Sequence, residues 1–347
     1  MKFRPKSLDQ QTIVITGASS GIGLATARQA VAEGAAVVLV ARNEDALKTI
    51  CDELREQGGR VAYAVADVGV EADVDGVVQT ALREFGGFDT WVNDAGVGIY
   101  GDLMDIPIEE HERLFQTNYW GVVFGSKAAV QHFRTTGGGV VINIGSINSD
   151  FAIPLLSAYA ASKHAVKGFT DGLRMELRHE GAPVSVTLIK PSGIGTPFPV
   201  HARNHMDSDP QVAPPVYAPE VVAGAILHAA THRVRDITVG ASGRMMVGAA
   251  VLAPGLADRF FAWSMPKVQQ TEKPRTEADS LFAHSDDGDM YRADKGPGRK
   301  FSVYTAAQKH PGAVAGAGLG LAALGAGAAV LLARRLSNGG APGRWAA

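Results

Sequence analysis

Between Thr12 and about Gly240 the sequence alternates short apolar runs with longer amphipathic segments. The apolar runs are TIVIT, AVVLVA, VAYAVA, DTWVN, GVVINIGS, VSVTLIK and DITVG, and the intervening segments repeat apolar residues at helical spacing. Regular alternation of strand and helix produces parallel strands joined by right-handed crossovers, with helices on both faces of the sheet. The pattern predicts an α/β, Rossmann-like doubly wound parallel sheet of about seven strands, within a catalytic domain at residues 1–250.

Charge and cysteine content exclude several other classes of protein. A net charge of -2 provides no field for nucleic acid, so no nucleic-acid partner is expected. Cys51 is the only cysteine, which excludes a disulfide within the chain and makes a cysteine metal cluster unexpected. His201 and His205 have a metal-like spacing but no third ligand nearby, and no metal site is predicted. No signal-like apolar run precedes the first strand, so we expect a cytoplasmic catalytic domain.

The chain beyond residue 250 changes character. Residues 251–268 predict an additional apolar-faced helix, and residues 269–310 are polar and predict a partly disordered linker. Residues 311–333 carry no charge and are followed by Arg334 and Arg335, so residues 311–335 predict a C-terminal transmembrane helix. The alternatives for this stretch are a soluble alanine-rich helix and a disordered tail.

A glycine-rich turn, TGASSGIG at residues 16–23, follows the first strand and leads directly into a helix. Such a turn presents free backbone N–H groups and the positive end of the helix dipole to a pyrophosphate. Gly17 permits the tight turn, Gly21 lets the backbone approach the phosphates, and Gly23 allows close contact between helix and strand. We therefore expect a dinucleotide cofactor here.

The catalytic candidates are Ser146, at the end of the fifth strand, and the pair Tyr159 and Lys163 in SAYAASKHAV. Spacing of four residues on a helix places Tyr159 and Lys163 on one face, about one turn apart. Transfer of a hydride to a carbonyl needs a proton donor, and a cation lowers the pKa of a tyrosine toward neutrality. We expect Lys163 to act on Tyr159 in this way.

With these motifs the sequence resembles the short-chain dehydrogenase/reductase family over about residues 11–251. Its turn is Thr-Gly-x-x-x-Gly-x-Gly, and Asn93 to Gly96 match its Asn-Asn-Ala-Gly motif except for Asp94. The resemblance implies catalytic roles for Ser146, Tyr159, Lys163 and Asn118, the last in a proton relay through water. It also implies that Lys163 binds the nicotinamide ribose. The implied cofactor-binding residues are Thr16, Gly17, Ser19, Ser20, Gly21, Ile22, Gly23, Arg42, Asp67, Val68, Asn93, Ala95, Gly96, Tyr159, Lys163, Pro191, Ile194 and Thr196.

Two features bear on the cofactor. The second strand ends at Ala41 and Arg42 without an acidic residue, and an arginine here accommodates a 2′-phosphate, which favours NADP(H) over NAD(H). Ser192 stands where the family usually has a glycine, which is a departure from the family motif at the turn before Ile194.

The sequence therefore predicts an NADP(H)-dependent oxidoreductase that interconverts a carbonyl and a secondary alcohol. The predicted anchor favours a lipophilic small-molecule substrate, and a homo-oligomer is expected from the family. Phe198, Met206 and Tyr217 are the candidates to line the substrate pocket. The alternative is a non-catalytic dinucleotide-binding sensor or scaffold at the membrane.

Overall fold

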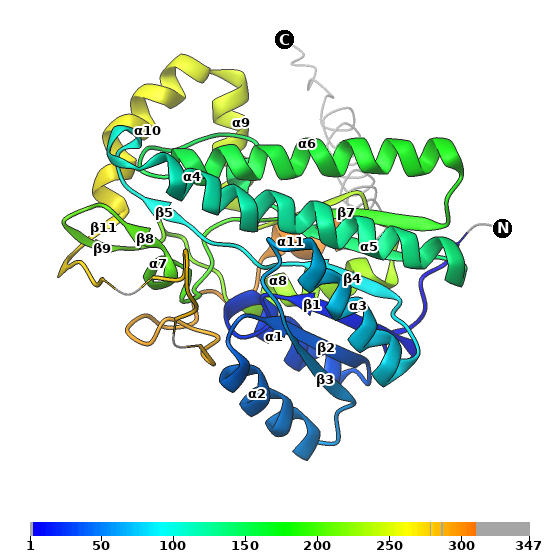
Figure 1. Cartoon of the computed structure of the whole chain (residues 1–347). Coiled ribbons are helices and arrows are strands. Elements are labelled where there is room, and N and C mark those ends of the chain that lie inside the picture. The colour runs from blue at the N-terminus through cyan, green and yellow to red at the C-terminus, as the bar shows by residue number, and fades with distance from the viewer. Residues whose placement is uncertain (1–2, 278, 286, 310–347) are drawn as a thin grey trace, which may run out of the picture. The chain divides into compact units, whose positions relative to one another are not determined.

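Within residues 3–277, 279–285 and 287–309, which the computed structural model describes, seven parallel strands form the central sheet (Figure 1). Their order across the sheet is β10-β7-β6-β4-β1-β2-β3. Their bounds are β1 (Thr12–Thr16), β2 (Ala36–Ala41), β3 (Val61–Val65), β4 (Thr90–Asn93), β6 (Gly139–Ile144), β7 (Val184–Pro191) and β10 (Asp236–Val239). The predicted seven-stranded, doubly wound sheet is thus confirmed.

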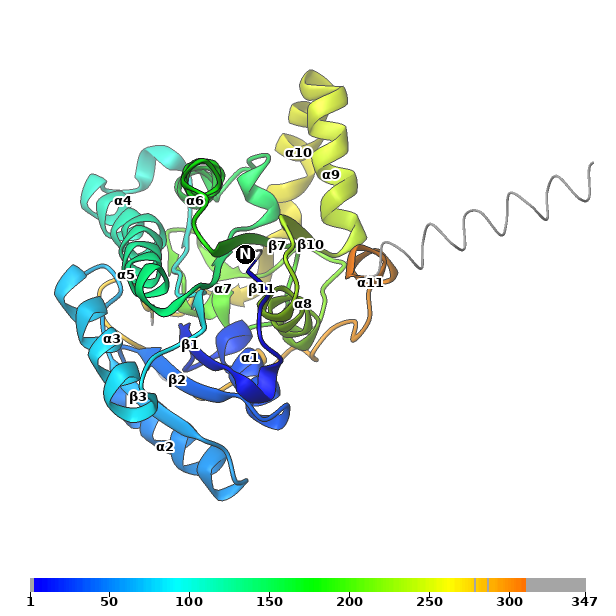
Figure 2. The same cartoon turned by 90° about the vertical axis from the view of Figure 1, so that its right-hand side faces the viewer.

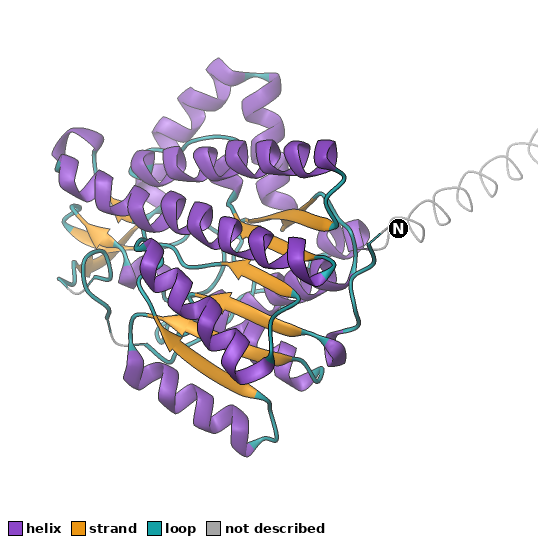
Figure 3. Cartoon of the chain, turned by 45° about the vertical axis from the view of Figure 1, so that its right-hand side comes forward, coloured by secondary structure: helices purple, strands orange, loops and turns teal. Residues whose placement is uncertain are grey.

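Helices cover both faces of this sheet (Figure 3). One face packs against α1 (Gly21–Ala32), α2 (Glu44–Glu56) and α8 (Pro219–Thr231). The other packs against α3 (Glu71–Phe85), α5 (Gly121–Thr136) and α6 (Ser157–Glu180). Because both faces are covered, every residue of β2 and β6 is buried, which explains why these strands read as continuous apolar runs.

The chain reverses its direction of winding between β1 and β4. Strand β1 pairs with β2 on one side and β4 on the other, so the two halves of the sheet wind away from this point. Ligands of open α/β sheets bind beyond the carboxyl ends of the strands at such a switch point. Helix α4 (Ile108–Phe115), a π-helical turn at Gln116–Trp120 and α5 follow β4 and pass close to this edge.

Smaller elements lie beyond the carboxyl edge of the sheet. Strand β5 (Ile99–Tyr100) pairs with β8 (Arg203–Asn204), and β9 (Ser208–Pro210) pairs with β11 (Gln270–Pro274). Helix α7 (Phe198–His201) precedes β8, and α11 (Val303–Lys309) ends the described residues. The 3-10 helices span Leu8–Gln10, Leu103–Asp105 and Ile147–Ser149.

The helix predicted at residues 251–268 is part of a hairpin of α9 (Ala241–Leu252) and α10 (Pro254–Val268) (Figure 2). The predicted domain boundary at residue 250 therefore falls inside α9. Val247, Phe261 and Met265 on the inner face pack around Phe151. The large apolar residues exposed on the hairpin are Met245, Val251, Leu252, Leu256, Phe260 and Trp263.

Residues 269–309 do not form the predicted linker; their described part belongs largely to the compact unit of residues 1–305. Leu281 is completely buried, and Arg292 is only 6 % exposed. The guanidinium of Arg292 pairs with Asp209 at 2.9 Å and donates to the Pro210 carbonyl at 2.6 Å. The segment is held mainly by polar contacts to loops that are distant in the sequence, and it has no periodic apolar face. For this reason its polar, non-periodic sequence is typical of a linker although the segment is packed.

No helix among the described residues is long and apolar enough to cross a membrane. The transmembrane helix predicted at residues 311–335 lies outside the described residues.

The buried Arg292–Asp209 pair makes a measurable prediction for stability. The side chains are 6 % and 7 % exposed, so Arg292→Met leaves a buried carboxylate without its cation. We expect the free energy of unfolding in urea to fall by about 3–5 kcal/mol. Lys273→Met removes an exposed cation from Asp294 and is the matched control, with an expected loss below about 1 kcal/mol. Equal losses for the two variants would contradict the assignment.

Candidate active site

The turn between β1 and α1 has the geometry that a phosphate-binding loop requires. Gly17 has a φ of +69°, and a Cβ there would lie 2.9 Å from the Ala95 backbone nitrogen. A Cβ on Gly23 would lie 2.1 Å from the Gly17 carbonyl oxygen, so only glycine permits this approach of helix to strand. The predicted reasons for these two glycines are therefore correct in steric terms, and the N-terminus of α1 points at the carboxyl edge of the sheet.

A cavity of about 320 Å³ extends along this edge. Most of the predicted cofactor residues line it: Gly17, Ser19, Ser20, Gly21, Ile22, Arg42, Asp67, Val68, Ala95, Gly96, Tyr159, Lys163, Pro191, Ile194 and Thr196. Ser146 lines it as well. The fold therefore brings the turn, the ends of β2 and β3 and the catalytic candidates to one continuous space.

Thr16, Gly23 and Asn93, also predicted as cofactor residues, lie behind this wall instead. The Thr16 hydroxyl accepts hydrogen bonds from the backbone N–H groups of Asp94 and Ala95 at 3.0 and 3.1 Å. Asn93 is buried and donates to the Asn143 side chain at 2.8 Å, which ties β4 to β6. The side chains of Thr16 and Asn93 position the cavity wall and do not reach the cavity.

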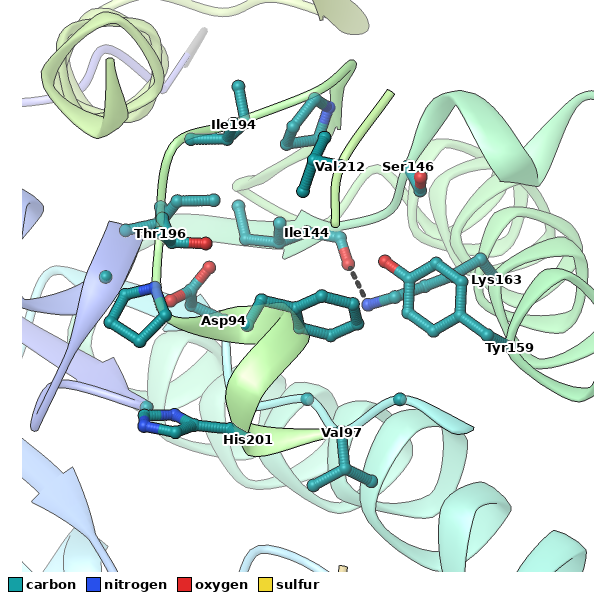
Figure 4. A pocket seen from close by; sticks show the side chains of 18 of the residues that line it. Asp94, Val97, Ile144, Ser146, Tyr159, Lys163, Ile194, Thr196, His201 and Val212 are labelled. Atoms are coloured by element: carbon teal, nitrogen blue, oxygen red, sulfur yellow. Dashed lines mark hydrogen bonds between the residues drawn. The ribbon is translucent and has the colours of Figure 1, made fainter. Parts of the chain in front are cut away.

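Ser146, Tyr159 and Lys163 lie together on one side of the cavity (Figure 4). The Lys163 ammonium donates a hydrogen bond of 2.9 Å to the Ile144 carbonyl and lies 5.6 Å from the centroid of the Tyr159 ring. The Ser146 hydroxyl accepts the Asn148 N–H at 3.1 Å and caps the short helix that follows β6. These bonds hold Lys163 on α6 and Ser146 just after β6, and Tyr159 lies one helical turn before Lys163 on α6.

Burial dominates the acid–base properties of the pair. It raises the pKa of Tyr159 to about 12, although the hydrogen bond with Ser146 lowers that pKa. Burial also lowers the pKa of Lys163 to about 8, although the nearby Asp94 carboxylate raises that pKa. Desolvation of the phenolate dominates the pKa of Tyr159, and the predicted lowering of that pKa by Lys163 stays a prediction.

Asn118 lies on the π-helical turn, completely buried. Its amide oxygen accepts the Val97 N–H at 2.8 Å, and its amide nitrogen donates to the Val97 carbonyl at 2.9 Å and to Ser162 at 3.1 Å. Asn118 does not line the cavity. Its observed contacts hold the backbone after β4, and π-helical turns often occur at functional sites.

Asp94 is a site residue that the sequence marked only as a departure from a motif. Its carboxylate faces Lys163 from the opposite side of the cavity and accepts a hydrogen bond from the Gly23 N–H (Figure 4). Burial raises the pKa of Asp94 to about 7, while Lys163 and the Gly23 N–H lower it. The carboxylate also raises the pKa of Tyr159, so it influences both groups of the catalytic pair.

Ser192 is accommodated by a glycine elsewhere in the chain. A Cβ on Gly240, where φ is +101°, would lie 2.1 Å from the Ser192 hydroxyl. Within the described residues, the buried hydroxyls of Ser192 and Thr117 have no hydrogen-bond partner, and both residues line the cavity. Unsatisfied buried hydroxyls in a cavity wall fit a site that is completed by a polar ligand such as a dinucleotide.

Arg42 lies at the far end of the cavity. Burial and the neighbouring Arg113 guanidinium lower its pKa, while the carboxylates of Asp67, Asp287 and Asp279 raise it. Asp67 pairs with Arg113 at 2.5 Å and accepts the Gly69 N–H at 2.9 Å. Arg113 was not predicted from the sequence, because its contact with Asp67 depends on the position of α4.

The rest of the cavity is mainly apolar. Its lining includes Phe151, Ile153, Leu156, Phe198, Val212, Ala213, Pro214, Pro215, Met246 and Met265. Of the three predicted substrate-pocket residues, Phe198 lines the cavity, whereas Met206 and Tyr217 are buried in core clusters. Ser280, His284 and Asp287 from the C-terminal segment also line it and had no signal in the sequence.

Comparison with known proteins agrees with this geometry. The sequence profile of the short chain dehydrogenase family matches residues 11–207. The chain belongs to the short-chain dehydrogenase family. It is an NAD(P)-dependent oxidoreductase, because its relatives and structural neighbours are dehydrogenases and reductases of this type.

Two curated relatives and one solved structure illustrate the similarity. The chain is 44% identical over 314 residues to the uncharacterized oxidoreductase YxnA of Bacillus subtilis, covering 89% of this chain and 88% of the relative. It is 34% identical over 240 residues to 3beta-hydroxysteroid dehydrogenase 1 of Eggerthella lenta, covering 67% of this chain and 90% of the relative. A family member from Burkholderia phymatum in complex with NAD is 26% identical with a TM-score of 0.67, covering 72% of this chain and 96% of that one.

The Asp94 carboxylate predicts a shift in pH dependence. A negative Asp94 raises the pKa of Tyr159, so Asp94→Asn lowers that pKa. With Tyr159 as the predicted base, alcohol oxidation increases as pH rises through this pKa, so the increase should move to lower pH in the variant. The pH profile of kcat/KM measures the shift. Asp102→Asn removes an exposed carboxylate and is the control, with no shift expected. A shift of the Asp94→Asn profile to higher pH would contradict the assignment.

Proposed function

We propose that this dehydrogenase uses NADP(H) to interconvert a carbonyl and a secondary alcohol on a lipophilic substrate. The observation that carries the proposal is the position of Ser146, Tyr159 and Lys163, where a phosphate-binding turn and an apolar cavity meet. The turn, the unsatisfied hydroxyls and the cavity support a dinucleotide. A bound nicotinamide supplies the hydride for reduction, or accepts it for oxidation.

The residues of the chain then handle the proton. The Tyr159 hydroxyl gives its proton to the substrate oxygen in reduction and takes it back in oxidation. The Ser146 hydroxyl donates a hydrogen bond to the same oxygen and stabilises its developing charge. Lys163, fixed by the Ile144 carbonyl, favours the ionised tyrosine and binds the ribose hydroxyls of the cofactor. Asn118 holds the backbone of Val97. We also propose that Asn118 binds a water molecule that links Lys163 to solvent in a proton relay.

The cavity lining supports the lipophilic substrate. Phe151, Val212, Met246 and Met265 present apolar surface beside the catalytic hydroxyls. Methionine side chains adapt to irregular apolar ligands. The relative from Eggerthella lenta is named as acting on a hydroxysteroid, which is an alcohol of this class. The expected homo-oligomer and the membrane anchor at residues 311–335 stay predictions.

The catalytic proposal is tested with Tyr159→Phe. We expect kcat/KM over a panel of ketones and secondary alcohols of increasing lipophilicity to fall by about 10²–10⁴-fold, because the acid–base hydroxyl is lost. NADPH binding, followed by its fluorescence, should be retained. Tyr63→Phe removes a hydroxyl outside the cavity and is the matched control. NADPH binding to the wild-type protein without turnover of any panel member would favour the sensor or scaffold instead.

The cofactor preference is tested separately with Arg42→Ala. Arg42 is the residue proposed to bind the 2′-phosphate of NADP(H). We therefore expect Arg42→Ala to reduce kcat/KM for NADPH by about tenfold or more, and to reduce kcat/KM for NADH much less. The ratio of the two values isolates the 2′-phosphate from any general loosening of the site. Equal kcat/KM for NADPH and NADH in the wild-type enzyme would overturn the preference.

A further inference from the structure

Part of the C-terminal segment lies directly on the phosphate-binding turn. We call residues 279–285 and 287–291 the strap. The Ser19 hydroxyl donates to the Asp287 carboxylate at 2.8 Å, and the Gly288 N–H donates to the Ser19 carbonyl at 2.9 Å. The Gly21 N–H, at the first position of α1, donates to the Asp289 carbonyl at 3.0 Å. Two donors of the turn are thus engaged by the strap.

The strap also reaches the far end of the cavity. Arg42 donates to the Ser280 carbonyl at 2.5 Å, and Arg113 donates to the Leu281 carbonyl at 2.9 Å. Asn43 donates to the Ser285 carbonyl at 3.1 Å. The strap therefore uses the cation that is proposed to recognise the 2′-phosphate.

On the opposite side the strap is joined to α7 and β8. The Ser280 N–H donates to the His201 carbonyl at 2.7 Å, and Arg203 pairs with Asp279 at 3.1 Å. The strap therefore spans the cavity from the phosphate turn to the segment that carries Phe198. Ser280, His284 and Asp287 face the cavity as part of its wall.

Leu281 anchors one end of the strap, and Met290 packs against the main core cluster at the other end. The Leu281 side chain is completely buried, in a cluster with Val97, Ile99, Ile106, Leu114 and Ala158. It does not line the cavity, so its role there is to fix the strap to the body of the domain.

We propose that the strap closes over the bound dinucleotide, giving up its bonds with Ser19, Gly21 and Arg42 to the cofactor phosphates, and must move away from the phosphate turn whenever the cofactor enters or leaves. This rests on the proposed use of the cavity for NAD(P)(H). The strap joins both rims of the cavity, and its contacts with the turn and with Arg42 are hydrogen bonds that break and re-form without disrupting the core. Leu281 favours the closed position.

Asp287 acts in the opposite direction. Its carboxylate lies on Ser19, at the turn that binds the phosphates, and like charges at short distance repel. The closed strap is therefore held by an apolar anchor and weakened by a carboxylate when the anionic cofactor is bound. The strap sets the rate of cofactor exchange through the difference between these two effects.

The test measures release of NADPH, and of NADH in parallel, by stopped-flow fluorescence after mixing the preformed complex with excess oxidised cofactor. Leu281→Ala removes the anchor without touching the cavity, and we expect dissociation to accelerate by about tenfold or more. Asp287→Asn keeps an oxygen that can accept the Ser19 hydrogen bond and removes the charge, so dissociation should slow by about threefold. The proposal therefore predicts faster NADPH dissociation in Leu281→Ala and slower NADPH dissociation in Asp287→Asn.

Leu54→Ala is the matched control, since Leu54 is also a buried leucine but lies in the core cluster around α2. It should leave the dissociation rate within about twofold of wild type, as expected for a distant site. An equal acceleration by Leu54→Ala and Leu281→Ala would overturn the proposal, because general loosening would then explain both. Should Leu281→Ala fail to fold, unchanged or faster release in Asp287→Asn would overturn it by itself.

Hydrogen exchange separates this proposal from the proposed function. NADPH should protect backbone amides of the strap as well as those of the turn at residues 16–23. Protection of the turn without the strap, together with unchanged release rates, would overturn the strap proposal alone. Failure of both NADPH and NADH to bind the wild-type protein would overturn the proposed function and the strap proposal together.

Discussion

The ammonium group of Lys163 donates a hydrogen bond to the Ile144 carbonyl, and this contact joins α6 to the end of β6 inside the protein. Lys163 is only 4 % exposed, so its position is set by this bond and by the packing of α6 against the sheet. Ser146 follows Ile144 by two residues, and Tyr159 precedes Lys163 by one helical turn. This buried contact between helix and strand, together with the packing of α6, therefore sets the relative positions of the three proposed catalytic groups.

Burial makes this contact strong and also sets the chemistry. A cation removed from water needs acceptors and neighbouring negative charge, and the Ile144 carbonyl and the Asp94 carboxylate provide them. The same desolvation raises the pKa of Tyr159 to about 12. The protein groups alone thus hold the tyrosine in its protonated form. Its ionisation depends on the charges that surround it: Asp94 opposes the phenolate, and we propose that Lys163 favours it.

Much of the fold and of the catalytic centre can be predicted from the sequence, because their signals are local. The apolar runs identify the strands of the central sheet, and the spacing of Tyr159 from Lys163 needs only helical geometry. The turn at Gly17 is recognisable for the same reason, since its steric requirement is met within a few residues. Parallel strands then bring these local features to one edge of the sheet.

Other parts of the site depend on contacts between residues far apart in the chain, for which the sequence has no periodic signal. Arg113 is a helix-surface residue by pattern, and only the position of α4 brings it to Asp67. Ser192 departs from a family motif, and its side chain fits only because residue 240 is a glycine. Gly240 lies after α8 in the sequence but next to Ser192 in the fold. Leu281 is an isolated apolar residue in a polar segment, so the segment resembles a linker although its anchor is fully buried.

The proposed movement of the strap would explain how a tightly packed phosphate turn can still exchange its cofactor. Gly17 is packed closely against the backbone of Ala95, just after β4, and Gly23 against the Gly17 carbonyl, so the turn itself has little freedom to move. The strap is held by hydrogen bonds to the same turn, by the Arg203–Asp279 ion pair and by the separate apolar contacts of Leu281 and Met290, without a continuous apolar face. Because a structure opens where few apolar contacts have to be broken, the strap is the part of the cavity wall that we propose to open. A rigid phosphate site beneath a strap that can move away would let the chain position a cofactor firmly and still release it.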